Sequence, residues 1–296
     1  MPFDLSRYLT IAISSRALFD LEEENALFER QGTVVYEAYQ VDHEREVLKP
    51  GPGFPLVKAL LKLNGPLAND RKVEVIILSR NNPCVGLRLM HSVEHYGLDI
   101  TRAAFTSGTP VSRYLHSFGV ALFLSRHAED VKEALAGGTA AGLLYALPAD
   151  FTAELDGIRI AFDGDAVIFS DEAERIFQDQ GLEAFERHEK ENADRPLPAG
   201  PFARLLKSLA DLQRRNRPDC PIRLALITAR NSPAHERVLK TLRAWQVRID
   251  EMFFLGGAPK DAVLRAFQPH IFFDDRDAHC VPAARVAPTA QVPNDR

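Results

Sequence analysis

The chain has 296 residues, of which 46% are hydrophobic and 26% are charged, a composition that is typical of folded globular proteins and excludes extensive disorder. Its net charge of −5 provides no broad basic surface, which argues against a nucleic acid polymer as the main partner. The first ten residues, MPFDLSRYLT, lack a secretory signal, and no apolar run approaches the roughly 20 residues of a membrane span. The odd, widely spaced cysteines form no CxxC pair, so we expect a protein of the reducing cytoplasm without a membrane partner.

Short apolar runs rich in β-branched residues alternate with longer amphipathic stretches along the chain. Continuous apolar strands between helical segments predict a parallel sheet that is covered on both faces, so the expected fold class is α/β with a doubly wound sheet. Apolar residues at helical spacing predict helices over 205–215 and 235–245. The clearest predicted strands are 73–78, 158–162, 222–227 and 271–273.

The chain also repeats itself. Residues 11–60 align without a gap on 160–209, and 14 of these 50 positions are identical, where random pairing would give about three. The match resumes with a shift of one where Arg80-Asn81 faces Arg230-Asn231. We infer two tandem α/β modules of like topology, 1–150 and 151–296, joined near 147–156. GPGFP at 51–55 is interpreted as the entry to a helix, because its counterpart at 200–204 is GPFAR.

The first candidate motif is DGDAV, directly after the predicted strand 158–162. Two carboxylates two residues apart can divide the work of phosphoester hydrolysis: Asp163 attacks phosphorus, and Asp165 manages the proton. A calcium loop is disfavoured, because Val167 and Ile168 stand where such a loop requires an oxygen ligand and a glycine. A plain acidic turn is the other interpretation, and DxD alone favours it.

Two further motifs lie in predicted turns at the carboxyl ends of strands. Thr228, Ala229 and Arg230 follow strand 222–227, where a hydroxyl and free backbone N–H groups suit a phosphate oxygen; a helix cap by Asn231 or Ser232 explains the same residues. GGAPK places a lysine after two glycines, so Lys260 could hold a phosphate beside the carboxylates, or it could be a solvated surface lysine.

The fourth motif is Asp274-Asp275, after the apolar strand 271–273. Several aspartates at neighbouring strand ends are costly to hold together unless a cation lies among them. Mg²⁺ is the natural occupant, because it prefers carboxylate oxygens, water and phosphate as ligands. A solvated acidic loop is the weaker interpretation here, because Phe272 and Phe273 should draw the strand into the core.

In order and placement, these four segments resemble motifs I to IV of the haloacid dehalogenase superfamily of phosphatases. FDGDAVIFSDEAERIF, LITARN, GAPK and HIFFDD resemble, more narrowly, the cytosolic 5′-nucleotidases of the AMP-preferring type I family, and IAISSRALFDLEEENALFERQG extends the similarity to the first half. The resemblance implies that Asp163 is nucleophile and metal ligand, and that Asp165 is acid and base and binds metal through its carbonyl. It implies phosphate binding by Thr228, Ala229, Arg230 and Lys260, and completion of a Mg²⁺ site by Asp274 and Asp275.

The resemblance also implies a helical cap inserted after the first motif, which would span about 171–220 and select the substrate. The candidate side chains there are Phe177, Phe185, His188, Lys190 and Phe202.

The first module lacks the candidate catalytic side chains. In the internal alignment Asp163, Asp165, Thr228, Lys260, Asp274 and Asp275 face Ser14, Arg16, Leu78, Val111, Ser125 and Arg126. We therefore expect a catalytically silent copy that holds no metal. Arg16 and Arg126 could bind an anion such as the phosphate of an effector. The preferred interpretation is that they pair with acids such as Glu22–Glu24 or pack between the modules.

The expected function is Mg²⁺-dependent hydrolysis of a nucleoside 5′-monophosphate such as AMP, through an aspartyl-phosphate. The alternatives are a phosphatase for another small phosphoester and a non-catalytic nucleotide-binding protein. Substrate base, sugar and a possible homo-oligomeric state are left open by the sequence.

Overall fold

The computed structural model describes residues 4–65, 71–83, 86–148, 151, 157–216, 220–231 and 234–294. The chain divides into two compact units, Met1–Ala146 and Leu147–Arg296. Each unit is an α/β domain with a parallel sheet, as the alternation of apolar runs and amphipathic stretches predicts. Of the predicted junction 147–156, residues 149–150 and 152–156 lie outside the described residues. No helix in the described ranges is both long and apolar enough to cross a membrane.

The first unit has its strands in the order β3-β2-β1-β4-β5. Ile13 at the end of β1 pairs with Ile77 of β2 on one side and with Leu124 of β4 on the other. The order therefore reverses at β1. The strands are β1 (Leu9–Ile13), β2 (Val73–Ser79), β3 (Arg102–Phe105), β4 (Leu122–Ser125) and β5 (Ala140–Leu144), and the helices are η1 (Leu5–Arg7), α1 (Ser15–Leu18), α2 (Glu22–Asp42), α3 (Phe54–Leu61), α4 (Gly86–His95), α5 (Ser112–Leu115) and α6 (Ala128–Ala136).

The second unit has the same strand order, β8-β7-β6-β9-β10, with its reversal at β6. Phe162 at the end of β6 pairs with Leu226 of β7 and Phe273 of β9. The strands are β6 (Ile158–Phe162), β7 (Ile222–Thr228), β8 (Glu251–Phe254), β9 (Ile271–Asp274) and β10 (Thr289–Gln291), and the helices are η4 (Gly164–Ile168), α7 (Glu172–Gln180), α8 (Leu182–Glu191), α9 (Ala203–Arg215), α10 (His235–Ala244), α11 (Asp261–Phe267) and α12 (Asp277–Ala283). All four predicted strands and both predicted helices are confirmed to within two residues.

The central strands of each sheet are mostly apolar and buried. β2 and β9 are buried along their whole length, and buried side chains from strands and helices form one core cluster in each unit. Phe273 packs between Phe162, 5.5 Å away, and Phe202, 4.7 Å away, as measured between ring centroids. Because Phe202 is the residue before α9, this contact places the start of α9 against the sheet of the second unit.

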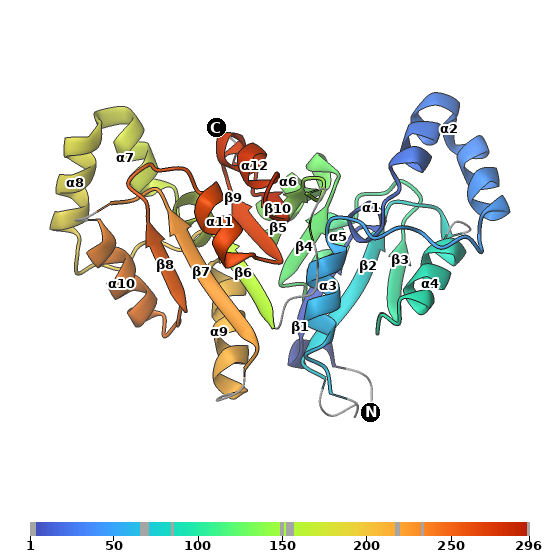
Figure 1. Ribbon diagram of the computed structural model, residues 1–296, viewed down its shortest axis with the longest axis horizontal. Helices are drawn as coiled ribbons and strands as arrows, with labels where there is room; N and C mark the ends of the chain where they lie inside the picture. Colours follow the sequence, from blue (N-terminus) through green and yellow to red (C-terminus); the bar gives the residue numbers. More distant parts are fainter. Residues whose placement is uncertain are drawn as a thin grey trace. The chain divides into compact units, whose positions relative to one another are not determined.

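The stretch predicted as a cap, 171–220, therefore has two parts. Helices α7 and α8 lie beyond the carboxyl ends of the strands of their unit, and α9 lies along the strands (Figure 1). The inner face of α9 is buried, including Leu205, Leu206 and Leu209. The helices available to cover the strand ends are limited to 172–191. The first unit carries a helix at the corresponding place, α2, which is kinked where Gly32 adopts a φ of 76°.

The two units share the strand order expected of an internal repeat, but the gapless alignment is wrong in the turn after β6. Gly51 and Gly200 donate equivalent hydrogen bonds to the carbonyls of Leu18 and Ile168. Leu18 lies four residues after Ser14, and Ile168 lies five residues after Asp163. The second unit thus has one additional residue in this turn, where Ala166 adopts the left-handed φ of 61°. Both Gly-Pro segments precede helices, α3 and α9, as predicted.

Candidate active site

The candidate site lies where the strand order of the second unit reverses. Asp163 directly follows β6, and Asp274 is the last residue of the neighbouring strand β9. Ligands of open parallel sheets bind outside the carboxyl ends of the strands at such a reversal. The predicted residues of motifs I and IV are therefore brought to the place where the topology favours a ligand.

Lys260 joins these two strand ends. It precedes α11, and its Nζ donates hydrogen bonds to Asp163 Oδ1 at 2.5 Å and to Asp274 Oδ2 at 2.6 Å. All three residues are buried, with 6%, 7% and 0% of their surface exposed, respectively. A buried charge is tolerated only when it is paired, so these three side chains depend on one another. The interpretation of Lys260 as a solvated surface lysine is excluded.

Asp163, Asp274 and Asp275 could hold a metal ion. One carboxylate oxygen of each lies within 4.8 Å of the others. Small hard divalent cations prefer such oxygen ligands, so the donor set fits the predicted ion. The predicted fourth ligand atom, the main-chain carbonyl of Asp165, stays a prediction.

Burial raises the pKa of Asp163 to about 6; Lys260 opposes this rise, and the nearby charge of Asp274 adds to it. Burial also acts on Asp274, but its hydrogen bond from His279 and the charge of Lys260 hold the pKa of Asp274 below its ordinary value. Burial alone would lower the pKa of Lys260, and the charges of Asp163 and Asp274 raise it instead. Lys260 therefore stays charged, and Asp163 is the carboxylate of the pair whose ionised form is less favoured.

Thr228 lies at the end of the neighbouring strand β7. It is 2% exposed, and its Oγ1 accepts a hydrogen bond from the backbone N–H of Arg230 at 3.2 Å. A Cβ on Gly164 would lie 3.2 Å from this Oγ1, so the glycine allows Thr228 to approach the turn after Asp163. Ala229 is exposed beside Thr228. Of the cap residues predicted as an alternative, Asn231 lies before α10 without being its N-cap, which is Ala234, and Ser232 lies outside the described residues.

Phosphate binding at Arg230 stays a prediction, and the Arg230 side chain pairs with carboxylates. Its Nε and Nη2 donate to both carboxylate oxygens of Asp165, at 2.8 and 2.7 Å, and its Nη1 donates to Glu189 of α8. The guanidinium is 2% exposed. A planar guanidinium held by two carboxylates has its donors occupied, so Arg230 orients Asp165 and ties it to α8.

Sequence reasoning missed Glu189, Arg237 and His279, which are linked to this site. Glu189 accepts from Arg230 and, at 2.8 Å, from Arg237 of α10, so a buried charge network extends from Asp165 through two helices. His279 of α12 lies with its Nδ1 3.2 Å from both carboxylate oxygens of Asp274. His279 follows Asp274 by five residues, within the turn and helix after β9. This short separation in the sequence is the signal from which its contact with Asp274 could have been predicted. The Glu189 contact had no signal in the sequence.

In the first unit, the corresponding strand ends carry hydroxyls in place of carboxylates. Ser14 follows β1 and Ser125 ends β4, as the alignment predicts. The predicted pairing of Thr228 with Leu78 is wrong. Ser79 ends β2 and accepts a hydrogen bond at 3.1 Å from the N–H two residues on, as Thr228 does in β7, so a hydroxyl is kept at this position.

Comparisons with known proteins find related sequences. A family model described as 5′-nucleotidase matches residues 1–296. Human cytosolic 5′-nucleotidase 1B is 39% identical over 293 residues, which cover 95% of this chain and 48% of the human protein. The chain thus spans about half the length of that curated relative. No solved structure matches the chain significantly.

Proposed function

Because the chain belongs to the 5′-nucleotidase family, we propose that its second unit hydrolyses nucleoside 5′-monophosphates, with AMP as a substrate. The observation that carries this proposal is the buried arrangement of Asp163, Lys260 and Asp274 at the reversal of the strand order. A nucleophilic carboxylate, a fixed cation and a metal-binding carboxylate are the groups that transfer of a phosphoryl group to a side chain requires.

We assign Mg²⁺ as the ion, with Asp163, Asp274 and Asp275 as the carboxylate ligands and the Asp165 carbonyl as a further one. When bound, Mg²⁺ neutralises negative charge on the phosphoryl group. Lys260 and Thr228 contribute a positive charge and a hydroxyl to the phosphate oxygens, and the backbone N–H of Ala229 is a third donor at the same strand end.

Two displacements complete the reaction. A carboxylate oxygen of Asp163 forms a bond to phosphorus while the bond from phosphorus to the 5′ oxygen breaks, and Asp165 gives its proton to the departing 5′ oxygen. The nucleoside then leaves. Water next attacks the phosphorus of the aspartyl-phosphate, Asp165 takes a proton from that water, and inorganic phosphate and free Asp163 are regenerated.

Asp165 must leave its contact with Arg230 to do this work. Both of its oxygens are engaged by the guanidinium in the structure, and the carboxylate side chain is 15% exposed. A rotation that frees one oxygen would bring the carboxyl group toward the leaving group. Since Arg230 also holds Glu189 of α8, we propose that substrate binding under α7 and α8 and release of Asp165 occur together.

Among the candidate aromatics of the predicted cap, we assign Phe177 to the base of the nucleotide. Phe185 and Phe202 are buried at 7% and 0% exposure, and Phe177 is 44% exposed. Phe177 lies one turn after Glu174 of α7, whose carboxylate accepts a hydrogen bond from Arg276, two residues after Asp274. This contact fixes α7 next to the site. We propose accordingly that α7 and α8 act as the cap of a haloacid dehalogenase-like module, and that the first unit is a silent copy of it.

The experiment is a measurement of phosphate released from a panel of nucleoside 5′-monophosphates and sugar phosphates, with Mg²⁺ and with EDTA. Release from the nucleotides that requires Mg²⁺ and disappears in Asp163→Asn is the expected result. Preference for sugar phosphates would make the protein a phosphatase of another class. If the wild type released no phosphate but still bound nucleotide, the protein would be a nucleotide-binding protein and not a hydrolase.

A further inference from the structure

The first unit contains a cavity of about 490 Å³ at the carboxyl ends of β1, β2 and β4. This volume lies within the roughly 300–1,000 Å³ that small-molecule sites occupy. Its lining includes Ser14, Ser79 and Ser125, which occupy the positions of Asp163, Thr228 and Asp274 in the second unit. The cavity is therefore the counterpart of the candidate active site.

The charge of this cavity differs in sign at the positions that hold carboxylates in the second unit. Arg16 lies two residues after Ser14, as Asp165 does after Asp163, and Arg126 stands in the position of Asp275; both arginines line the cavity. Two guanidinium groups at one sheet edge repel a metal ion, and together with three hydroxyls they can bind an oxyanion. The chemistry that this edge fits is a phosphate bound without metal.

Two buried polar atoms of this edge have no hydrogen-bond partner in the described part of the chain, Ser14 Oγ and Arg16 Nε. Buried polar atoms are nearly always bonded, so an unpartnered donor pair calls for a ligand. Arg16 and Arg126 do pair with Glu22, at 3.1 and 3.4 Å, which confirms the preferred prediction from the sequence. The Glu22 side chain is 46% exposed, however, and one exposed carboxylate shared by two arginines is a weak competitor for an anion.

Aromatic side chains form another wall of the cavity. Phe28 and Tyr36 of α2 line it, with their rings edge to face at 5.8 Å between centroids. Tyr36 is buried, and Phe28 is 45% exposed. The pair corresponds to Phe177 and Phe185 of the second unit, which also meet edge to face. An exposed ring beside a phosphate site suits the flat face of a nucleobase.

We infer that the first unit binds a nucleoside phosphate in this cavity without a metal ion, with the phosphate against Ser14, Arg16 and Arg126 and the base against Phe28. The inference that a phosphate binds here depends only on the side chains that line the cavity. The nucleoside part also rests on the proposed function, because it assumes that the two related units recognise related ligands.

The test is hydrogen–deuterium exchange of the wild-type chain in EDTA, titrated with AMP and, separately, with inorganic phosphate. We expect AMP to protect amides around residues 14–16 and 125–127 and on α2 around Phe28, and phosphate to protect only the strand ends. Absence of protection in the first unit at saturating AMP would overturn the inference. Equal protection by phosphate and AMP on every segment would overturn its nucleoside part.

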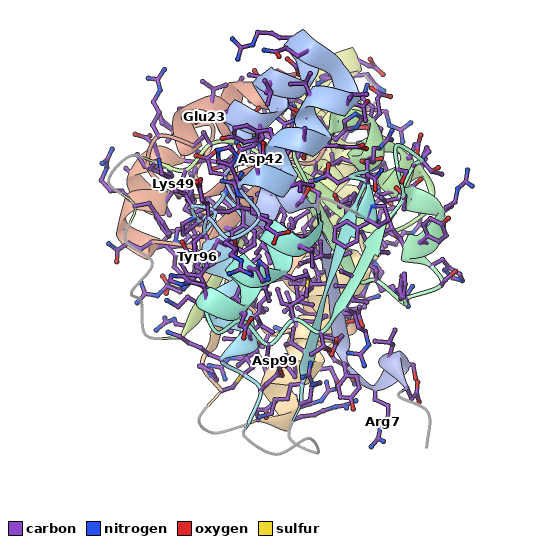
Figure 2. All side chains as sticks on the ribbon, turned by 90° about the vertical axis from the view of Figure 1, so that its right-hand side faces the viewer. Arg7, Glu23, Asp42, Lys49, Tyr96 and Asp99 are labelled. Carbon is purple, nitrogen blue, oxygen red and sulfur yellow. The ribbon has the colours of Figure 1, made fainter. Side chains whose placement is uncertain are left out.

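A double variant, Arg16→Gln with Arg126→Gln, tests the assigned side chains. The Kd for AMP, read from protection of the first unit, should rise at least tenfold, because two charge-assisted hydrogen-bond donors are lost. The matched control is Arg7→Gln, which removes an exposed arginine from the opposite end of this unit, far from α2 with its labelled Glu23 and Asp42 (Figure 2). An unchanged Kd in the double variant would overturn the assignment, and if that variant fails to fold, the exchange result on the wild type decides.

Failure of this inference is distinguishable from failure of the proposed function. The exchange experiment reads peptides of the first unit in chelator, whereas hydrolysis is read as phosphate released with Mg²⁺. A chain that binds AMP in the first unit and releases no phosphate would support nucleotide binding in the cavity and refute the proposed hydrolysis.

Discussion

Asp163 is the residue whose surroundings most clearly suit catalysis. It is buried, its carboxylate has Lys260 as a counter-charge, and two further aspartates lie close enough to share a metal ion with it. Such a cluster is poorly arranged for stability when no cation is bound, because the buried carboxylates of Asp163 and Asp274 share one ammonium group. This loss of stability is expected of a site whose charges serve to bind a divalent ion and a phosphate.

We predict a stability change with pH in EDTA that depends on Asp163. Burial raises the pKa of Asp163 to about 6, so its contribution to stability is present below the unfolded value of 3.8 and is lost as the pH rises through 6. Asp163→Asn removes this loss, and above pH 6 the variant should exceed wild type by on the order of 2–3 kcal/mol. Urea unfolding from pH 4 to 8 in EDTA measures this difference.

Addition of Mg²⁺ provides the control for that experiment. Because the ion binds the ionised carboxylates, it should stabilise the wild type more than the Asn variant and reverse their order at pH 8. A wild type that gains stability from pH 4 to 8 in EDTA, with the variant doing the same, would contradict the account of the buried cluster.

Arg230 has a different task, which a second variant tests. Arg230→Ala leaves Asp165 and Glu189 near each other without their shared cation, so we expect a loss of about 3–5 kcal/mol in the free energy of unfolding. The matched control is Arg175→Ala on α7, whose pair with Asp171 is exposed and should contribute about 0–1 kcal/mol. Similar losses in the two variants, measured by urea denaturation, would show that the buried network has no special weight.

At the scale of elements, α7 and α8 determine what reaches the strand ends. They are joined at Gly181, whose φ of 80° is a left-handed conformation that glycine adopts readily, and the first unit has its kink at Gly32 in the corresponding place. Polar links from these helices to the site run from Glu189 through Arg230 and from Glu174 to Arg276. This construction fits helices that close over a substrate.

Phe177→Ala tests the substrate-facing side of α7. If the exposed ring stacks on the base, the KM for AMP should rise about 5- to 100-fold, since base stacking contributes roughly 1–3 kcal/mol. The kcat should change little, because the ring touches no reacting atom. Leu182→Ala on α8 is the control, since that side chain is also about half exposed, at 49%. Steady-state kinetics in which both variants share one KM would contradict the assignment.

The sequence predicts the strands and their terminal residues well, because a buried parallel strand is a continuous apolar run and its end is marked by the first polar residues. Asp163, Thr228 and Asp274 were found in this way. Pairing of Asp165 with Arg230 and of Arg230 with Glu189 was not predictable, since it depends on how α8 is placed over the strands. The position of α9 against the sheet was missed for the same reason: an amphipathic helix does not reveal which surface it covers.

At the scale of the whole molecule, the two units keep one architecture and differ in chemistry. The strand orders agree, while three hydroxyls in the first unit stand where the second unit has Asp163, Thr228 and Asp274. Because Ser79 keeps a hydroxyl where the second unit has Thr228, the strand ends of the first unit retain a group that can bind an anion.

We predict that all hydrolysis comes from the second unit. Asp163→Asn should lower kcat by at least a thousandfold, and Ser14→Ala, the change at the corresponding place in the first unit, should leave the chemical step unchanged. Single-turnover phosphate release at saturating AMP and Mg²⁺ measures that step. A comparable loss in Ser14→Ala would mean that the first unit takes part in the chemistry.

The most direct test of the account is the stereochemical course of the reaction at phosphorus. A nucleoside 5′-phosphorothioate made chiral at phosphorus by two oxygen isotopes is hydrolysed with Mg²⁺ in water of the third oxygen isotope, and the configuration of the released thiophosphate is determined. Transfer to Asp163 followed by attack of water comprises two displacements, so the account predicts retention of configuration. Inversion would show a single attack by water and would contradict the role of Asp163 as nucleophile.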